Sequence, residues 1–315
     1  MSKIEEIIEN IGRPIVENAF NELLKEIPSN EARKIIRAFS KKWKDYSRVA
    51  LMALSCQSVG GDSGLINEIA KSLVLIGGGI DIHDDIVDSS FFRTKKHKRT
   101  LLGKYGIARA LLIGDALLMG GLLISHKLWS ILPREKANVV LEAIKQGLFE
   151  LGSAEFEELK FVRNVNVTER QYLRIVYMKA ADVEAYTKIG GIIGNGTNEE
   201  IEALAKFGRY LGMIAILRDD VEDTFYDDYE LISRITKESL PYPIICSLKN
   251  LECRDIINKM LNNMEEQDIK NLKLLLRRNK SFEKTKKVIN SLIKKAKIEA
   301  NKVKNSELLL ALFKH

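Results

Sequence analysis

Proline and cysteine are both scarce in this chain of 315 residues, which contains five prolines and three cysteines. With so few prolines, and no Gly/Ser-rich or Pro-rich linker between two halves, we expect one domain spanning residues 1–315. The cysteines, Cys56, Cys246 and Cys253, form no C-x-x-C pair. This spacing argues against a disulfide framework or a zinc site and favours a reducing compartment. We therefore expect a cytoplasmic protein.

Long uncharged apolar runs are also missing. The first residues, MSKIEEIIENIG, carry acids where a signal peptide needs a positive region followed by an apolar run. We find no uncharged apolar stretch of about 18 residues, so no membrane span is expected. The net charge is +7, and much of the basic excess lies in residues 272–304. Basic residues there alternate with Leu, Ile and Val at helical spacing, which indicates a solvated helix face rather than a nucleic-acid surface.

Apolar residues recur three and four positions apart along nearly the whole chain, which is the spacing of amphipathic helices. The sequences TERQ (168–171) and TNEE (197–200) have the form of capping boxes, and PSNEA (28–32) and LPREKA (132–137) indicate breaks. Strand-like alternation is essentially missing. We predict an all-α protein of roughly ten or more helices, many about 20–28 residues long. The predicted helical segments are 2–26, 31–58, 63–89, 104–131, 134–162, 169–193, 198–226 and most of the C-terminal third.

The segment DIHDDIVD (81–88) follows the apolar run SLVLIGGGI with no turn signal between them. Asp81, Asp84, Asp85 and Asp88 stand at i, i+3, i+4 and i+7, so a helix would place them along one stripe. Neighbouring carboxylates in such a stripe repel by about 3 kcal/mol at an effective dielectric constant of ~20. The pattern therefore predicts a positively charged partner.

A second segment, LGMIAILRDDVEDTFYDD, repeats the arrangement with Asp219, Asp220, Glu222 and Asp223 after an apolar run. One acidic patch is usually a solvated helix end, but two patches of the same form favour cation binding. Oxygen ligands without a neighbouring His/Cys set indicate Mg²⁺. Magnesium at the mouth of an apolar cleft suits a ligand with an apolar tail and a diphosphate head.

Six motifs in order give the sequence a resemblance to a known family: HDDIVD, YGIARALLIGDALL (105–118), AEFEEL (154–159), MKAA (178–181), RDDVED and KESLP (237–241). The chain resembles the trans-isoprenyl diphosphate synthases, which are polyprenyl synthetases with the class I terpenoid synthase fold. The resemblance implies an all-α, single-domain bundle of long, mostly antiparallel helices around a central apolar cavity. It also implies a homodimer, with a hetero-oligomer as the alternative.

The resemblance assigns roles to individual residues. The implied Mg²⁺ ligands are Asp84, Asp88 and Asp219, with Asp85, Asp220 and Asp223 supporting them or bridging ions. Arg93, Lys179 and Lys237 would bind the diphosphate of an allylic substrate, and ionisation of its C–O bond would follow from charge stabilisation. The double bond of isopentenyl diphosphate would then attack the cation, a proton would leave, and the chain would grow by five carbons.

The departures from the family pattern gather at the implied isopentenyl-diphosphate site. Arg48 is kept, but Asp45 stands where the family has Lys, with Lys44 beside it. Gly77 stands where the family has His. The allylic site therefore matches the family, while the second diphosphate site is changed.

A further departure follows Arg93, where Thr94 replaces a second Arg and the basic segment 95–99 could supply charge instead. Three functions remain open. The first is chain elongation with isopentenyl diphosphate. The second is ionisation of a prenyl diphosphate with another acceptor, or terpene synthase-like cyclisation. The third is a weakly active subunit of a hetero-oligomer.

Product length is indicated only by three consecutive glycines, Gly77 to Gly79, just before the first acidic motif. Glycine inside a helix costs ~1 kcal/mol relative to alanine, so the run needs a reason. Close helix packing is one explanation. An open channel for a C20 or longer chain is the other.

Overall fold

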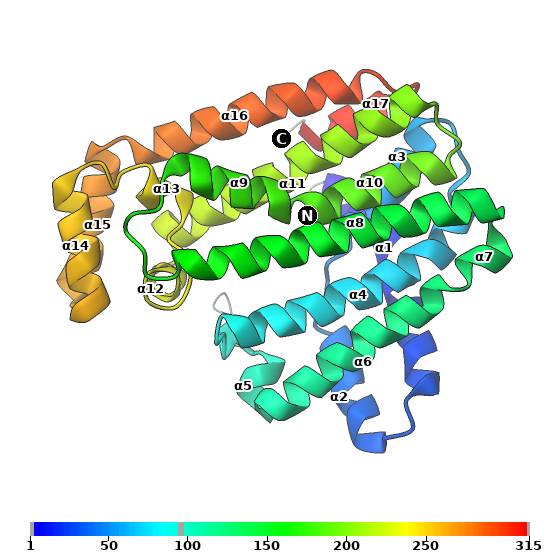
Figure 1. Ribbon diagram of the computed structural model, residues 1–315, viewed down its shortest axis with the longest axis horizontal. Helices are drawn as coiled ribbons and strands as arrows, with labels where there is room; N and C mark the ends of the chain where they lie inside the picture. The colour runs from blue at the N-terminus through cyan, green and yellow to red at the C-terminus, as the bar shows by residue number, and fades with distance from the viewer. Residues whose placement is uncertain (1–2, 94–97, 314–315) are drawn as a thin grey trace. The chain divides into compact units, whose positions relative to one another are not determined.

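The structure is a computed structural model that describes residues 3–93 and 98–313, and almost all of this part is helical (Figure 1). The long helices are α1 (Lys3–Glu26), α4 (Ile66–Val87), α6 (Ile107–Ser125), α8 (Arg134–Glu158), α11 (Asn198–Tyr226) and α16 (Ser281–Ala300). The shorter α-helices are α2 (Asn30–Ser40), α3 (Ser47–Ser58), α5 (Leu101–Tyr105), α7 (Leu128–Ile131), α9 (Glu169–Lys179), α10 (Ala181–Ile193), α12 (Asp228–Thr236), α13 (Tyr242–Ile245), α14 (Leu251–Asn262), α15 (Glu266–Arg278) and α17 (Glu307–Leu310). The 3₁₀ turns are η1 (Ser63–Leu65), η3 (Leu159–Phe161) and η4 (Ala311–Phe313).

A small antiparallel hairpin interrupts the helices. It consists of β1 (Phe92–Arg93) and β2 (Lys98–Arg99), with Phe92 opposite Arg99. The sequence analysis did not predict this hairpin, because two residues per strand are too few for an alternating pattern to be recognised.

The helices group into two compact units. Unit 1 comprises Met1–Lys145, Ala185–Ala205 and Ala300–His315. Unit 2 comprises Gln146–Glu184 and Lys206–Glu299. The unit boundaries fall within α8, α10 and α11, and before the last residue of α16.

Unit 1 is built on α4 and α6, which lie side by side (Figure 1). Glycines allow this approach: a Cβ on Gly79 would lie 2.7 Å from Leu118 Cγ and 2.9 Å from Gly114 O. On the facing helix, a Cβ on Gly121 would lie 2.6 Å from Ser72 O, and Ser72 Oγ donates to Gly121 O at 2.8 Å. Close helix packing therefore explains Gly79.

Gly77 has a different environment from Gly79. A Cβ there would have Tyr186 Oη at 3.8 Å and Trp43 Cζ2 at 3.9 Å as its nearest contacts. Trp43 belongs to the aromatic core of unit 1, because it stacks on Phe39 with ring centroids 6.5 Å apart and meets Phe20 edge-on at 5.8 Å. Packing alone therefore does not require glycine at position 77.

Unit 2 contains α9, most of α11, and α12 to α15. Within it, α14 and α15 lie beside each other (Figure 1), and Lys259 of α14 pairs with Asp268 of α15 at 2.8 Å. Buried Tyr172 of α9 stacks on Tyr242 of α13 with ring centroids 6.2 Å apart.

Both predicted capping boxes are present. Thr168 Oγ1 accepts from Gln171 N, and Thr197 Oγ1 accepts from Glu200 N. Three predicted helices are divided. The segment 104–131 is interrupted at Gly106, whose φ of 78° suits glycine. The segment 31–58 contains a turn at 41–46, and 169–193 is interrupted at Ala180.

Among the described residues, one helical stretch, Ile107–Ile131, is long and apolar enough to cross a membrane by length and composition. Only 28% of its most apolar window is buried. A single such helix is weak evidence of a membrane span.

Candidate functional site

The first acidic cluster occupies the C-terminal end of α4. Asp84 is exposed, while Asp85 and Asp88 are half-buried. Asp88 caps the helix, with its N–H donating to Asp84 O at 2.9 Å, and Ser89 then turns the chain with φ of 52°. Carboxylates at a helix C-terminus face the negative end of the macrodipole. The position strengthens the electrostatic need for a cation.

Asp81 is held by an aromatic side chain of the same unit. Trp43 Nε1 donates to Asp81 Oδ2 at 2.5 Å, and Trp43 is 8% exposed. Asp81 is therefore tied to the aromatic core of unit 1.

His83 connects the first acidic motif to the Gly-Asp pair of α6. Its Nε2 lies 3.2 Å from Asp115 Oδ1, outside hydrogen-bond geometry. A Cβ on Gly114 would lie 2.5 Å from the imidazole ring. Gly114, within the motif 105–118, therefore leaves space for the imidazole ring of His83.

The second acidic cluster, on α11, has two kinds of carboxylate. Asp219 is exposed, whereas Asp220 is 1% exposed. Asp220 accepts hydrogen bonds from Tyr172 Oη at 2.7 Å, Arg234 at 3.0 Å and Tyr242 N at 3.1 Å. These donors come from α9, α12 and the start of α13. Asp220 therefore fixes the end of α11 to three other elements of unit 2.

Burial dominates the electrostatics of this cluster. Burial raises the pKa of Asp220, although Arg234 and the Tyr172 hydroxyl oppose the shift. Burial also raises the pKa of Asp223 to about 7, with neighbouring carboxylates adding to the effect and Arg234 opposing it. A cation placed here would lower the pKa of Asp223 again.

Lys179 lies between two carboxylates of the segment AEFEEL. Its Nζ is 2.6 Å from Glu158 Oε2 and 3.1 Å from Glu155 Oε1. Ser239 Oγ donates to Glu158 Oε1 at 2.5 Å. Burial acts to raise the pKa of Glu158, but Lys179 and Arg234 lower it below its usual value. One ionised carboxylate therefore connects three of the six sequence motifs.

Lys237 follows α12 and is exposed, two residues before Ser239. Ser239, in the same segment as Lys237, and Lys179 both contact Glu158, so the two segments lie close together within unit 2. The sequence identified Lys179 and Lys237, but not Glu158 as the residue that connects them. The motif AEFEEL was the available signal.

The predicted residues of the second diphosphate site lie in unit 1. Arg48 forms an ion pair with Asp45, whose carboxylate also accepts from Ser47 Oγ at 2.6 Å. Burial acts to raise the pKa of Asp45, but Arg48 and Ser47 lower it on balance, so the carboxyl is ionised. Lys44 beside them is exposed. The substitution at position 45 therefore places a negative charge against Arg48.

Some predicted cations fall outside the described residues. Arg93 lies in β1, but its side chain is not described, and Thr94, Lys95 and Lys96 belong to the undescribed segment 94–97. In the described part, the Arg99 guanidinium lies over the Phe92 ring, 5.8 Å from its centroid.

Within residues 3–93 and 98–313, no three His, Cys, Asp or Glu side chains are grouped closely enough to hold a metal ion. The two acidic clusters belong to different units. Each is made of oxygen donors alone, which fits Mg²⁺ and does not fit zinc. Asp220 differs from the other carboxylates of these clusters, because its oxygens already accept hydrogen bonds from Tyr172, Arg234 and the Tyr242 backbone.

Comparison with known proteins gives consistent matches. The family model for polyprenyl synthetase matches residues 30–278. The chain is 27% identical over 257 residues to the short chain isoprenyl diphosphate synthase of Methanothermobacter thermautotrophicus, covering 80% of this chain and 73% of that protein. It is 30% identical over 185 residues to octaprenyl diphosphate synthase of Escherichia coli, covering 58% of this chain and 54% of that protein.

A solved structure resembles the chain over nearly its whole length. It is the geranylgeranyl pyrophosphate synthetase from Pyrococcus horikoshii, with a TM-score of 0.82 and 27% identity, covering 99% of this chain and 98% of that one.

Proposed function

The chain belongs to the polyprenyl synthetase family and is a prenyltransferase with the all-α isoprenoid synthase fold, and on this premise we propose its reaction. The enzyme condenses an allylic prenyl diphosphate with isopentenyl diphosphate to give a longer trans-polyprenyl diphosphate, in a Mg²⁺-dependent reaction. The observation that carries the proposal is the contact of Lys179 and Ser239 with Glu158, because it draws two diphosphate-binding segments together.

Asp84, Asp88 and Asp219 are the carboxylates that would hold Mg²⁺. Bound Mg²⁺ supplies stabilisation of the negative charge that develops on the departing diphosphate. Asp85 and Asp223 would support the ion from the same helices. Asp220 would position Asp219, because its hydrogen bonds to Tyr172 and Arg234 hold the end of α11 in place.

Lys179, Lys237 and Arg93 would bind the diphosphate of the allylic substrate. Cations aimed at the departing oxygens favour ionisation, because negative charge grows there in the transition state. Glu155 and Glu158 orient Lys179 through two ion pairs, at 3.1 and 2.6 Å. Apolar surroundings would then shelter the allylic cation from water.

We propose a homodimer in the cytoplasm, with a hetero-oligomer as the alternative assembly. The support is an apolar face on α6 where Leu112, Met119 and Leu123 are 67%, 58% and 69% exposed. Their spacing of seven and four residues places them on one side of the helix. A second copy of the same helix would cover this face.

The proposed product contains C20 or longer chains. The support is the glycine run before the first acidic motif. Gly79 is explained by packing, whereas a methyl group at position 77 would fit at ordinary contact distance from Tyr186 Oη and Trp43 Cζ2, at 3.8 and 3.9 Å, so packing does not account for Gly77. A larger side chain at position 77 would meet these two residues.

The Asp45–Arg48 ion pair favours a second candidate function. It places a carboxylate where a cation would bind the diphosphate of isopentenyl diphosphate, so the enzyme could instead pass the allylic cation to another acceptor or cyclise it. One assay separates the candidates. Purified protein is incubated with Mg²⁺, radiolabelled isopentenyl diphosphate and each of dimethylallyl, geranyl, farnesyl and geranylgeranyl diphosphate.

Longer diphosphates support elongation, and hydrocarbons or alcohols support the second candidate. Activity that requires an added partner protein indicates a hetero-oligomer. Asp84→Ala should abolish diphosphate release without changing the helical circular dichroism. Glu68→Ala, which removes a carboxylate from the other end of α4, is the matched control and should retain activity. Full turnover by Asp84→Ala would contradict the metal assignment.

A further inference from the structure

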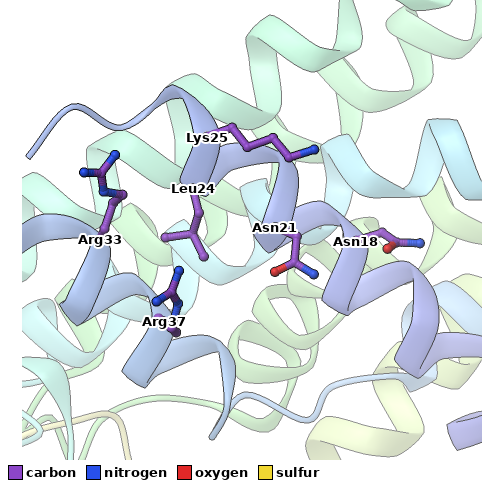
Figure 2. A pocket seen from close by; sticks show the side chains of 6 residues that line it. All are labelled: Asn18, Asn21, Leu24, Lys25, Arg33 and Arg37. Atoms are coloured by element: carbon purple, nitrogen blue, oxygen red, sulfur yellow. The ribbon is translucent and has the colours of Figure 1, made fainter. Parts of the chain in front are cut away.

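A pocket outside the proposed reaction site lies between α1 and α2 of unit 1 (Figure 2). Its volume is about 620 Å³. None of its lining residues was singled out by the sequence motifs, and neither helix contributes a residue to the proposed reaction. The lining residues are Asn18, Asn21, Leu24, Lys25, Arg33 and Arg37.

Helical spacing brings these side chains together. Asn18, Asn21 and Lys25 are separated by three and four residues, so they share one face of α1. Arg33 and Arg37 are four residues apart on α2. The short connection 27–29 joins the helices, and Leu24 is 7% exposed. Figure 2 shows Leu24 and Arg37 pointing toward each other from the two helices.

The charges of the lining residues all have the same sign. Three of the six are cationic, two are amides and none is acidic. Arg33 donates to Asn30 Oδ1, which is a neutral acceptor and leaves the guanidinium charge uncompensated by this contact.

Two acidic residues close in sequence to the pocket are paired with cations outside it. Glu22 is paired with Lys127 and lies 3.4 Å from Lys71. Glu31 lies 3.1 Å from Arg109 Nε. These pairings direct two carboxylates of α1 and α2 to cations that do not line the pocket. The six lining side chains themselves carry three positive charges and no negative charge.

We propose that this pocket binds a phosphate-bearing anion. Guanidinium groups present a planar set of donors that matches phosphate oxygens, and a lysine adds a mobile point charge. Arg33, Arg37 and Lys25 supply both kinds of donor from two helices, and the amides of Asn18 and Asn21 can donate to further oxygens. The anion is a free phosphate or diphosphate, or the phosphate of a lipid headgroup. The assignment does not depend on the proposed reaction.

The first experiment measures binding without catalysis. Inorganic diphosphate is titrated calorimetrically into the full chain at low ionic strength with EDTA present. Saturable binding is expected, and Arg33→Ala/Arg37→Ala should weaken it about tenfold or more, because charge-assisted hydrogen bonds are lost. Lys34→Ala/Lys41→Ala removes two exposed charges from the same region and should leave the affinity within about twofold. Arg37→Gln alone serves if the double variant does not fold.

A second variant distinguishes binding at this pocket from binding at the proposed reaction site. Lys179→Ala would weaken diphosphate binding at the proposed allylic site but should preserve the binding that depends on Arg33 and Arg37. Equal losses in the two charge-pair variants would overturn the proposal, since they would show a general charge effect.

Vesicles distinguish the two sources of phosphate. Flotation with phosphatidylcholine vesicles that contain phosphatidylglycerol is compared with phosphatidylcholine alone. Binding that requires phosphatidylglycerol and is lost in Arg33→Ala/Arg37→Ala, but not in Lys34→Ala/Lys41→Ala, assigns the site to lipid headgroups. Diphosphate binding without vesicle binding assigns it to a soluble anion. Neither kind of binding in the wild type would refute the proposal.

Discussion

Adding a single methyl group at two positions of α4 should have different effects on stability. In Gly79→Ala, the new Cβ would meet Leu118 Cγ at 2.7 Å and Gly114 O at 2.9 Å. The leucine can rotate, but the carbonyl belongs to the backbone of α6, so the two helices must separate. In Gly77→Ala, the nearest atoms lie at 3.8 and 3.9 Å, which is ordinary van der Waals contact.

The magnitudes follow from two terms. Alanine in place of glycine in a helix contributes about 1 kcal/mol of stability at either position. Overpacking at position 79 costs about 1–3 kcal/mol. We therefore expect Gly77→Ala to be more stable than the wild type by up to ~1 kcal/mol. We expect Gly79→Ala to be less stable than Gly77→Ala by about 1–3 kcal/mol.

Urea denaturation followed by circular dichroism provides the test. The free energy of unfolding is compared among the wild type and the two variants, with the same slope m required for a valid comparison. If Gly79→Ala proved as stable as Gly77→Ala, close approach of α4 and α6 would not be the reason for glycine at position 79.

Three further predictions follow from side-chain contacts. Tyr172→Phe removes a hydrogen bond to the buried Asp220 carboxylate and should lower the free energy of unfolding by about 2 kcal/mol in urea titrations; a change below about 0.5 kcal/mol would contradict this role. Asp45→Asn removes the negative charge beside Arg48 and should lower the KM for isopentenyl diphosphate about fivefold, a modest effect because the pair is half-exposed; an unchanged KM would favour a different acceptor. Burial raises the pKa of the Cys56 thiol to about 11, so labelling by a thiol reagent at pH 8 should be slow in the native protein and fast in urea; rapid native labelling would contradict the burial.

The helices were predictable because the apolar period reflects which side of each segment is buried. The capping boxes at Thr168 and Thr197 were also predictable, since their hydrogen bonds are local. The break at Gly106 was less so, because a glycine within an apolar helical pattern is compatible with continuation. The pattern did not indicate that its φ would be positive.

The site was predictable in its residue types and less so in its contacts. Asp219 and Asp220 are neighbours in one motif, but successive residues point about 100° apart on a helix. Which of them is buried depends on where α9 and α12 pack, and that is not encoded locally. The pairing of Arg48 with Asp45 was not predicted, although the two residues are only three apart in sequence, and the contact of Lys179 with Glu158 spans 21 residues.

The shared carboxylate of Glu158 constrains how this enzyme can change. Because it binds Lys179 with one oxygen and Ser239 with the other, a substitution in either segment alters the partner available to the other. Effects of paired substitutions at these positions should therefore not be additive. An evolutionary path that remodels the substrate pocket would have to replace both segments together, or first exchange Glu158 for a residue that tolerates either one.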